Sequence, residues 1–156
     1  MPLKGVPSIV PPTLLSILAS MGHGDELLIA DANFPASSQG REVIHMQGSS
    51  ATEVLEAVLT LLPLDSFAEY QASVMKQVHA PEQDAPIVGE FASILTKSYT
   101  KDGAKSPAAI ERIDRFAFYD KAKTTYAIIA TGEMRLYGNI IIKKGVIDAT
   151  GKVVML

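Results

Sequence analysis

Residues 21–35, MGHGDELLIADANFP, give the clearest indication of the fold class. Their centre, residues 27–30, is a continuous apolar run that follows two acidic residues and ends at Asp31. A short run of this kind is typical of a strand buried on both faces, as in sheets that helices cover on each side. The stretch therefore predicts a helix end, a turn and a central strand that leaves Asp31 at the edge of a sheet.

Helical patterns lie on both sides of this strand. Residues 12–21, PTLLSILASM, have apolar side chains at helical spacing, and Gly22 follows where a C-terminal cap is expected. Residues 50–62 carry one apolar stripe, and Ser50 stands three residues before Glu53, which predicts a capping box. The strand is thus expected to lie between two helices in the chain.

The remaining chain continues the alternation. Further strands are expected at residues 41–46, 73–78, 126–130 and 139–142, and further helices at residues 87–99 and 115–123. Such alternation predicts a layered α/β sandwich. A length of 156 residues fits one domain, residues 1–156.

Composition excludes several classes of partner. The net charge of −3, without a basic run, makes nucleic acid an unexpected ligand. The absence of cysteine excludes disulfides and thiolate metal sites. No signal peptide and no apolar stretch of roughly 20 residues is recognisable, so we expect a cytoplasmic protein with no membrane partner. Because 47% of the residues are hydrophobic and only 20% are charged, we expect other subunits to cover part of the surface.

His23 and Asp31 are the first candidates for chemistry. His23 lies between two glycines, where a helix is followed by a strand, and an imidazole can exchange a proton near neutral pH. It could instead cap the preceding helix. Asp31 falls at the carboxyl edge of the sheet, where open α/β folds gather their sites. It could equally close an Asx turn toward Asn33.

Two further groups of polar residues stand near the end of the chain. Tyr137, Gly138 and Asn139 precede the last expected strand and offer a phenol, a backbone without a side chain and an amide, although such a tripeptide is commonly only a turn. Arg112 and Arg115 flank residues 113–114, where one of them could form a structural ion pair with Asp114 or Glu111. His45 and His79 are interpreted as structural or solvated. The metal and nucleotide motifs HExxH, GxGxxG and the P-loop are absent, as is the GxSxG nucleophile motif.

Three separated segments, GHGDELLIADANFPA, ERIDRFAFYDKAK and ATGEMRLYGNIIIKKGV, resemble the L-fucose mutarotase family of the RbsD/FucU superfamily, which is related to D-ribose pyranase. The segments beginning at Leu3 and Leu55 are also similar to that family, whereas residues 70–107 are least so. The resemblance implies a cofactor-free isomerase with a layered α/β fold that interconverts the anomers of a reducing sugar. It also implies a ring-shaped homo-oligomer, commonly a decamer of two pentamers.

The resemblance assigns roles residue by residue. It places the catalytic histidine at His23 and the sugar-binding carboxylate at Asp31. Sugar contacts are implied for Arg115 and for the YGN element, which falls on Tyr137, Gly138 and Asn139. No metal site is implied, and Asn33 is a weaker candidate because its loop varies among relatives.

These roles give a mechanistic hypothesis. His23 would donate a proton, Asp31 and Arg115 would hold sugar hydroxyls, and Tyr137 and Asn139 would fix the ring or relay a second proton. Contact with the methyl group of the sugar is considered for one of three aromatic side chains: Phe34, Phe116 and Phe118. A D-ribose pyranase and a non-catalytic sugar-binding or transport-accessory protein remain the alternatives.

Overall fold

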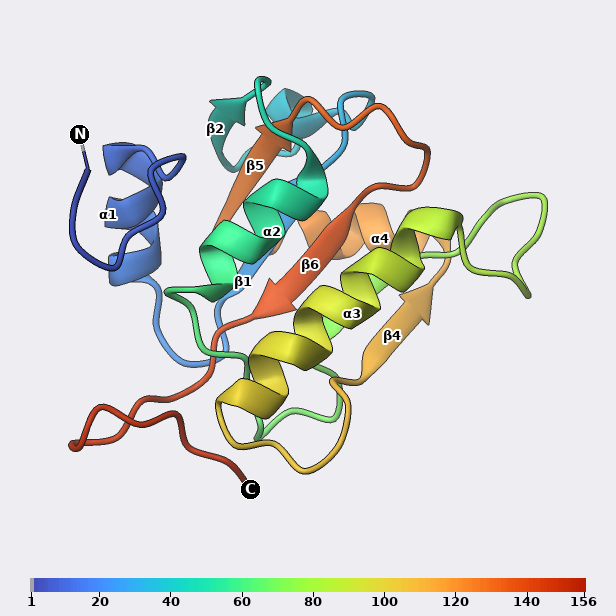
Figure 1. Cartoon of the computed structure of the whole chain (residues 1–156). Coiled ribbons are helices and arrows are strands. Elements are labelled where there is room, and N and C mark those ends of the chain that lie inside the picture. Colours follow the sequence, from blue (N-terminus) through green and yellow to red (C-terminus); the bar gives the residue numbers. More distant parts are fainter. Residues whose placement is uncertain (1) are drawn as a thin grey trace.

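The computed structural model describes residues 2–156 and contains one mixed sheet with helices on both faces (Figure 1). In chain order its elements are α1 (Pro12–Ser20), β1 (Glu26–Ala30), the 3-10 turn η1 (Ala36–Ser38), β2 (Glu42–Met46), α2 (Ala51–Leu59), β3 (Ala72–Met75), α3 (Pro86–Lys101), β4 (Ile110–Ile113), α4 (Arg115–Ala122), β5 (Ala127–Thr131) and β6 (Ile140–Lys143). The expected α/β sandwich is confirmed.

The strand order β2-β5-β1-β6-β3-β4 places β1 in the interior of the sheet. β1 runs parallel to β5 and antiparallel to β6, with Leu28 opposite Ile128 on one side and Ile141 on the other. Because β6 is antiparallel to both of its neighbours, the carboxyl end of β1 lies next to the beginning of β6. This arrangement brings Asp31 and Asn139 to the same edge.

Two apolar cores lie on opposite faces of the sheet. Leu27 and Ile29 of β1 pack into the core beneath α1, α2 and α3, whereas Leu28 and Ala30 pack into the core beneath α4 and η1. Figure 1 shows α2 and α3 in front of the sheet and α4 behind it. All four of these β1 side chains have no solvent exposure, which confirms a strand buried on both faces.

Local capping differs in part from the sequence expectation. Ser50 accepts a hydrogen bond from the backbone N–H of Glu53 at 3.2 Å, and its hydroxyl also lies 3.0 Å from the Glu53 carboxylate. Gly22, however, does not cap α1 as a left-handed glycine. The helix ends at Met21 in an extended conformation, and the left-handed residue is Gly24 at φ 84°.

Strand β4 has no counterpart among the sequence predictions. Its four residues, IERI, include a central Glu-Arg pair and form an edge strand beside β3. An edge strand needs no continuous apolar run, so β4 lacks the sequence pattern by which β1 is recognised. Among residues 2–156, no helix combines the length and apolar character needed to cross a bilayer.

Candidate functional site

The candidate site residues fall into two groups at opposite ends of β1. His23 precedes the strand and Asp31 follows it directly. The five residues of β1 alone extend about 16 Å at roughly 3.3 Å per residue. His23 and Asp31 of one chain are therefore not brought together.

At the carboxyl end, backbone and side-chain donors surround Asp31. Its Oδ1 accepts from the backbone N–H of Asn33 at 3.0 Å, which is the expected Asx turn. Its Oδ2 accepts from the Gly138 N–H at 3.2 Å and from Asn139 Nδ2 at 3.1 Å. Asn139 Oδ1 accepts from the Asp31 N–H at 2.7 Å. Burial is the main influence on the Asp31 pKa and raises it, although these hydrogen bonds oppose the effect.

The YGN element needs its central glycine. A Cβ on Gly138 would lie 2.9 Å from Glu133 Cγ and 3.3 Å from Asp31 Cβ, so a side chain would push the loop away from the carboxylate. Tyr137 adopts a left-handed backbone at φ 60°, and its hydroxyl accepts from the Val78 N–H at 2.9 Å. The sequence Tyr-Gly-Asn is thus a turn as well as part of the site.

A pocket of about 220 Å³ opens beside Asp31. Its lining consists of Asp31, Asn33, Phe34, Met75, Val78, Arg115, Tyr119, Leu136, Tyr137 and Asn139. Four of the five predicted sugar-binding residues therefore share one pocket, and the fifth, Gly138, donates a hydrogen bond to Asp31 without lining the pocket itself. Carboxylate, guanidinium, phenol and amide groups are thus combined with apolar walls, which suits a small polyhydroxylated ligand.

Aromatic side chains form part of this pocket. Arg115 places its guanidinium 5.4 Å from the centre of the Tyr119 ring, and Phe34 lies 5.5 Å from the same ring. Phe118 is fully buried in the core and Phe116 is 77% exposed, so Phe34 is the one of these three phenylalanines that lines the pocket. Sequence reasoning missed Tyr119, although it lies within the ERIDRFAFYDKAK segment.

The other end of β1 carries a histidine–carboxylate pair. His23 Nε2 lies 3.0 Å from Asp65 Oδ1, with the imidazole half exposed and the carboxylate buried. Asp65 Oδ1 also accepts from the Phe67 N–H at 3.0 Å, and the Phe67 ring lies 5.0 Å from the imidazole. The carboxylate therefore holds one ring nitrogen while the rest of the imidazole faces outward.

His23 is not the cap of α1. The carbonyl oxygens of Leu18, in the last turn of that helix, and of its C-cap residue Met21 accept hydrogen bonds from Lys144 Nζ at 2.8 and 2.5 Å, and the side-chain partner of His23 is Asp65. The capping alternative for His23 is therefore wrong. Gly145, which follows Lys144, permits close packing against Leu64, because a Cβ on Gly145 would lie 2.4 Å from the Leu64 carbonyl oxygen.

The remaining candidates are structural or exposed. Arg112 forms a bidentate pair with Asp84 at 2.7 and 2.8 Å, so neither Asp114 nor Glu111 is its partner. Asp114 instead caps α4 through the Ala117 N–H. His45 is exposed and contacts a neighbouring glutamine side chain. His79 lies in an exposed turn.

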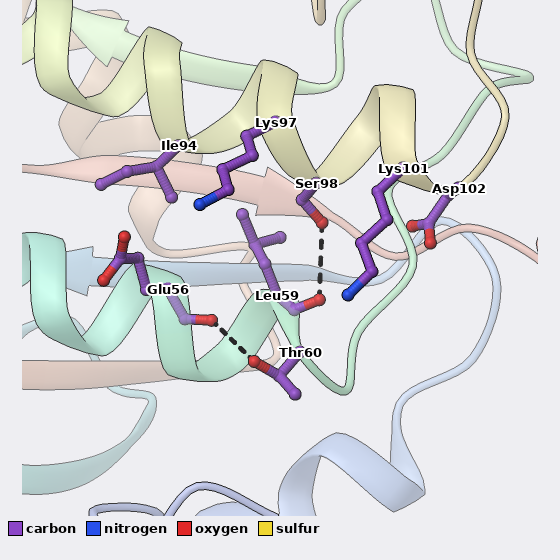
Figure 2. A pocket seen from close by; sticks show the side chains of 8 residues that line it. All are labelled: Glu56, Leu59, Thr60, Ile94, Lys97, Ser98, Lys101 and Asp102. Carbon is purple, nitrogen blue, oxygen red and sulfur yellow. Dashed lines mark hydrogen bonds between the residues drawn. The ribbon is translucent and has the colours of Figure 1, made fainter. Parts of the chain in front are cut away.

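A second hollow, of about 390 Å³, lies between α2 and α3 (Figure 2). Its lining mixes both charges and includes Glu56, Lys97, Lys101 and Asp102. None of the sequence-predicted site residues lies there. Within the described part of the chain, no group of three His, Asp or Glu side chains could hold a metal ion.

Comparison with known proteins gives a consistent result. Residues 4–147 match the model of the RbsD / FucU transport protein family. Fucose mutarotase from Mus musculus is 45% identical over 152 residues, covering 94% of this chain and 95% of its own. FucU from Bifidobacterium longum has 43% identity and a TM-score of 0.84, covering 93% of this chain and all of its own. A fucose mutarotase from Streptococcus pneumoniae, solved in complex with L-fucose, has 38% identity and a TM-score of 0.84. The match covers 94% of this chain and 100% of that chain.

Proposed function

The chain belongs to the RbsD/FucU family, and on that premise we propose that it is an L-fucose mutarotase, a cofactor-independent isomerase that interconverts the α and β anomers. The observation that carries the proposal is the pocket that combines Asp31, Arg115, Tyr137 and Asn139. These residue types bind sugar hydroxyl groups through charge-assisted and neutral hydrogen bonds. The complex of a similar protein with L-fucose favours this sugar.

The reaction needs two proton transfers. One proton leaves the anomeric hydroxyl while another reaches the ring oxygen; the C1–O5 bond breaks, C1–C2 rotates in the open aldehyde, and closure reverses the transfers. We assign His23 as the proton donor. Asp31 and Arg115 hold hydroxyl groups, and Tyr137 and Asn139 fix the ring or relay the second proton.

Asp65 completes the assignment at the histidine. Its buried carboxylate accepts from one imidazole nitrogen and fixes the orientation of the ring. The other nitrogen, Nδ1, is then free of this bond and can face a sugar. Asp65 is therefore a positioning residue for His23.

The separation of the two ends of β1 supports an active site between subunits. A monosaccharide that contacts both His23 and Asp31 must lie between two copies of the chain, because the length of β1 keeps the two groups of one chain apart. Exposed apolar residues flank each end: Phe67 beside His23, and Val78 and Leu136 at the pocket. Contacts of this head-to-tail type close into rings, in keeping with a ring-shaped oligomer, which we propose is a decamer. We also propose a cytoplasmic location.

Magnetisation exchange between anomeric protons tests the activity. Protein should accelerate exchange between the two anomers of L-fucose, measured by NMR with and without protein. Acceleration of pyranose–furanose exchange in D-ribose without an effect on L-fucose would favour the pyranase alternative. Binding of fucose without acceleration would favour a non-catalytic sugar-binding protein.

A mixing experiment tests the shared site. At a fucose concentration well below KM, H23Q and D31A should each show little exchange activity alone but regain activity when the two chains are unfolded and reassembled together. Random assembly leaves roughly a quarter of the interfaces with both intact groups. Two variants that stay inactive after mixing, in oligomers shown to contain both, would contradict a site that combines His23 of one chain with Asp31 of another.

A further inference from the structure

A buried carboxylate lies next to the pocket without lining it. The Glu133 side chain is only 6% exposed, and it belongs to the loop between β5 and β6 that also carries Tyr137 and Asn139. Buried carboxylates are costly unless they are paired and hydrogen-bonded. The hydrogen bonds and the ion pair of the Glu133 carboxylate therefore indicate its structural role.

Arg135 encloses this carboxylate. Its backbone N–H and Nε donate to Glu133 Oε2 at 3.2 and 3.1 Å, and its Nη2 donates to Oε1 at 3.0 Å. Its Nη1 also pairs with Glu90 on α3. The guanidinium is the main cause of a lowered pKa for Glu133, and the Ala51 N–H at the start of α2 lowers it further. The carboxylate thus stays ionised, held chiefly by Arg135 of its own loop.

Glu133 also packs against two residues that adjoin Asp31: Ala32, which follows it in the chain, and Gly138, which donates a hydrogen bond to it. Its carbonyl oxygen accepts from the Ala32 N–H at 2.8 Å, directly after Asp31. Its Cγ lies where it would obstruct any Cβ on Gly138, the residue whose N–H binds Asp31. The loop also holds Tyr137 in a left-handed conformation, which persists only where surrounding contacts enforce it.

We infer that Glu133, held by Arg135, is a positioning residue that keeps Asp31, Tyr137 and Asn139 in the geometry that binds sugar. The inference rests on the proposed mutarotase function. Glu133 does not line the pocket and takes no part in proton transfer. Its effect should therefore be seen mainly in KM, because Asp31 holds sugar hydroxyl groups and Tyr137 and Asn139 fix the ring.

The test is the variant E133Q, with fucose exchange measured over a range of sugar concentrations to separate kcat from KM. Glutamine keeps the shape but loses the charge, and Arg135, which is 44% exposed, can turn to water. We expect KM to rise about 10-fold or more, because small misplacements of binding groups have effects of this size. The change in kcat should be smaller. Partial unfolding alone would lower the active fraction and leave KM unchanged.

E90Q is the matched control, since it removes the exposed partner of Arg135 and leaves Glu133 paired; its KM should equal that of the wild type. If E133Q does not fold, R135K keeps a cation beside Glu133 while removing the bidentate contact, and it should also raise KM. An unchanged KM in folded E133Q, or in R135K where E133Q fails to fold, overturns the inference and leaves the mutarotase proposal intact. No fucose exchange in the wild type overturns both.

Discussion

The two ends of β1 are built in different ways. At the carboxyl end, Asp31 is buried and four hydrogen bonds within the chain fix its carboxylate and backbone N–H. At the amino end, His23 is half exposed and has one side-chain partner, Asp65. The first end suits recognition, because its groups are already oriented. The second suits proton transfer, because its imidazole can reach a ligand outside its own chain.

The difference implies that variants at the two ends should have different kinetic signatures. Changes near Asp31 should weaken sugar binding, and changes near His23 should slow the reaction of bound sugar. Each end contains a glycine that admits no side chain, Gly138 at one and Gly145 at the other. Close packing is thus needed at both ends, where it buries Asp31 at one and Asp65 at the other, whereas His23 stays half exposed.

H23Q should give the largest effect. Removing the proposed proton donor is expected to lower kcat by about 100- to 10,000-fold, the range typical of general acid–base assistance. KM should change little, because the pocket beside Asp31 is untouched. Saturation curves from NMR exchange measure both quantities.

Native folding and assembly of H23Q must be verified alongside its kinetics. The imidazole is half exposed, so its replacement should leave thermal unfolding and oligomer size unchanged. A kcat close to that of the wild type would remove His23 from the mechanism.

D65N should have the next largest effect. The amide can still meet His23 Nε2 but no longer carries the charge that orients the ring, and misplacement of a catalytic group can cost up to about 100-fold. We expect kcat to fall less than in H23Q. Combining H23Q with D65N should lower kcat no further than H23Q alone, because Asp65 acts through the imidazole. A further loss in the double variant would show a separate role for Asp65.

The sequence predicts the features that depend on residues close together in the chain better than those that depend on distant residues. The apolar run of β1 and the polar residues that bound it are local, and the strand ends one residue before Asp31, as expected. The capping of α2 by Ser50 is also local and is confirmed. In contrast, β4 was missed because its central residues are charged and it lies at the edge of the sheet.

The contacts within the site are the part that local patterns do not contain. Asp65 lies 42 positions from His23 in the chain, and nothing in the intervening residues indicates that they meet. The same holds for Arg112, whose partner Asp84 is 28 positions away rather than adjacent. Arg115, Tyr137 and Asn139 were grouped with Asp31 through family resemblance, and their shared pocket depends on the order of the strands.

Low pH should have the next largest effect, and it should act on sugar binding at the Asp31 end of β1. Burial raises the pKa of Asp31 above the ordinary 3.8, so the ionised form, which we propose accepts hydrogen bonds from sugar hydroxyl groups, is lost at a higher pH than for an exposed aspartate. Below that pKa, KM should rise about 10-fold per pH unit. The pH dependence of KM in fucose exchange gives the midpoint. A midpoint at or below 3.8 would contradict the role of burial.

Stability should change in the opposite direction over the same interval. Because the folded-state pKa of Asp31 is raised, the folded protein binds this proton more tightly than the unfolded chain does. Asp31 therefore contributes increasing stability as pH falls from its folded pKa to 3.8. Chemical unfolding of wild type and D31N at several pH values isolates this contribution, since other carboxyl groups titrate equally in both.

D84N should give the smallest effect and confine it to the Asp31 end. Arg112 holds the pKa of Asp84 below 3.8, so the pair contributes stability above pH 3.8 and loses it as pH falls through the lowered pKa. Both side chains are more than 40% exposed, and screening by water limits the expected loss in D84N to below about 1 kcal/mol at neutral pH. Asp84 lies in the segment that presents Val78 to Tyr137, so a slight rise in KM is expected with no change in kcat. Urea unfolding and fucose exchange at pH 7 measure these quantities. A drop in kcat without a rise in KM would show that the two ends of β1 are coupled, contrary to the separation of binding and proton transfer.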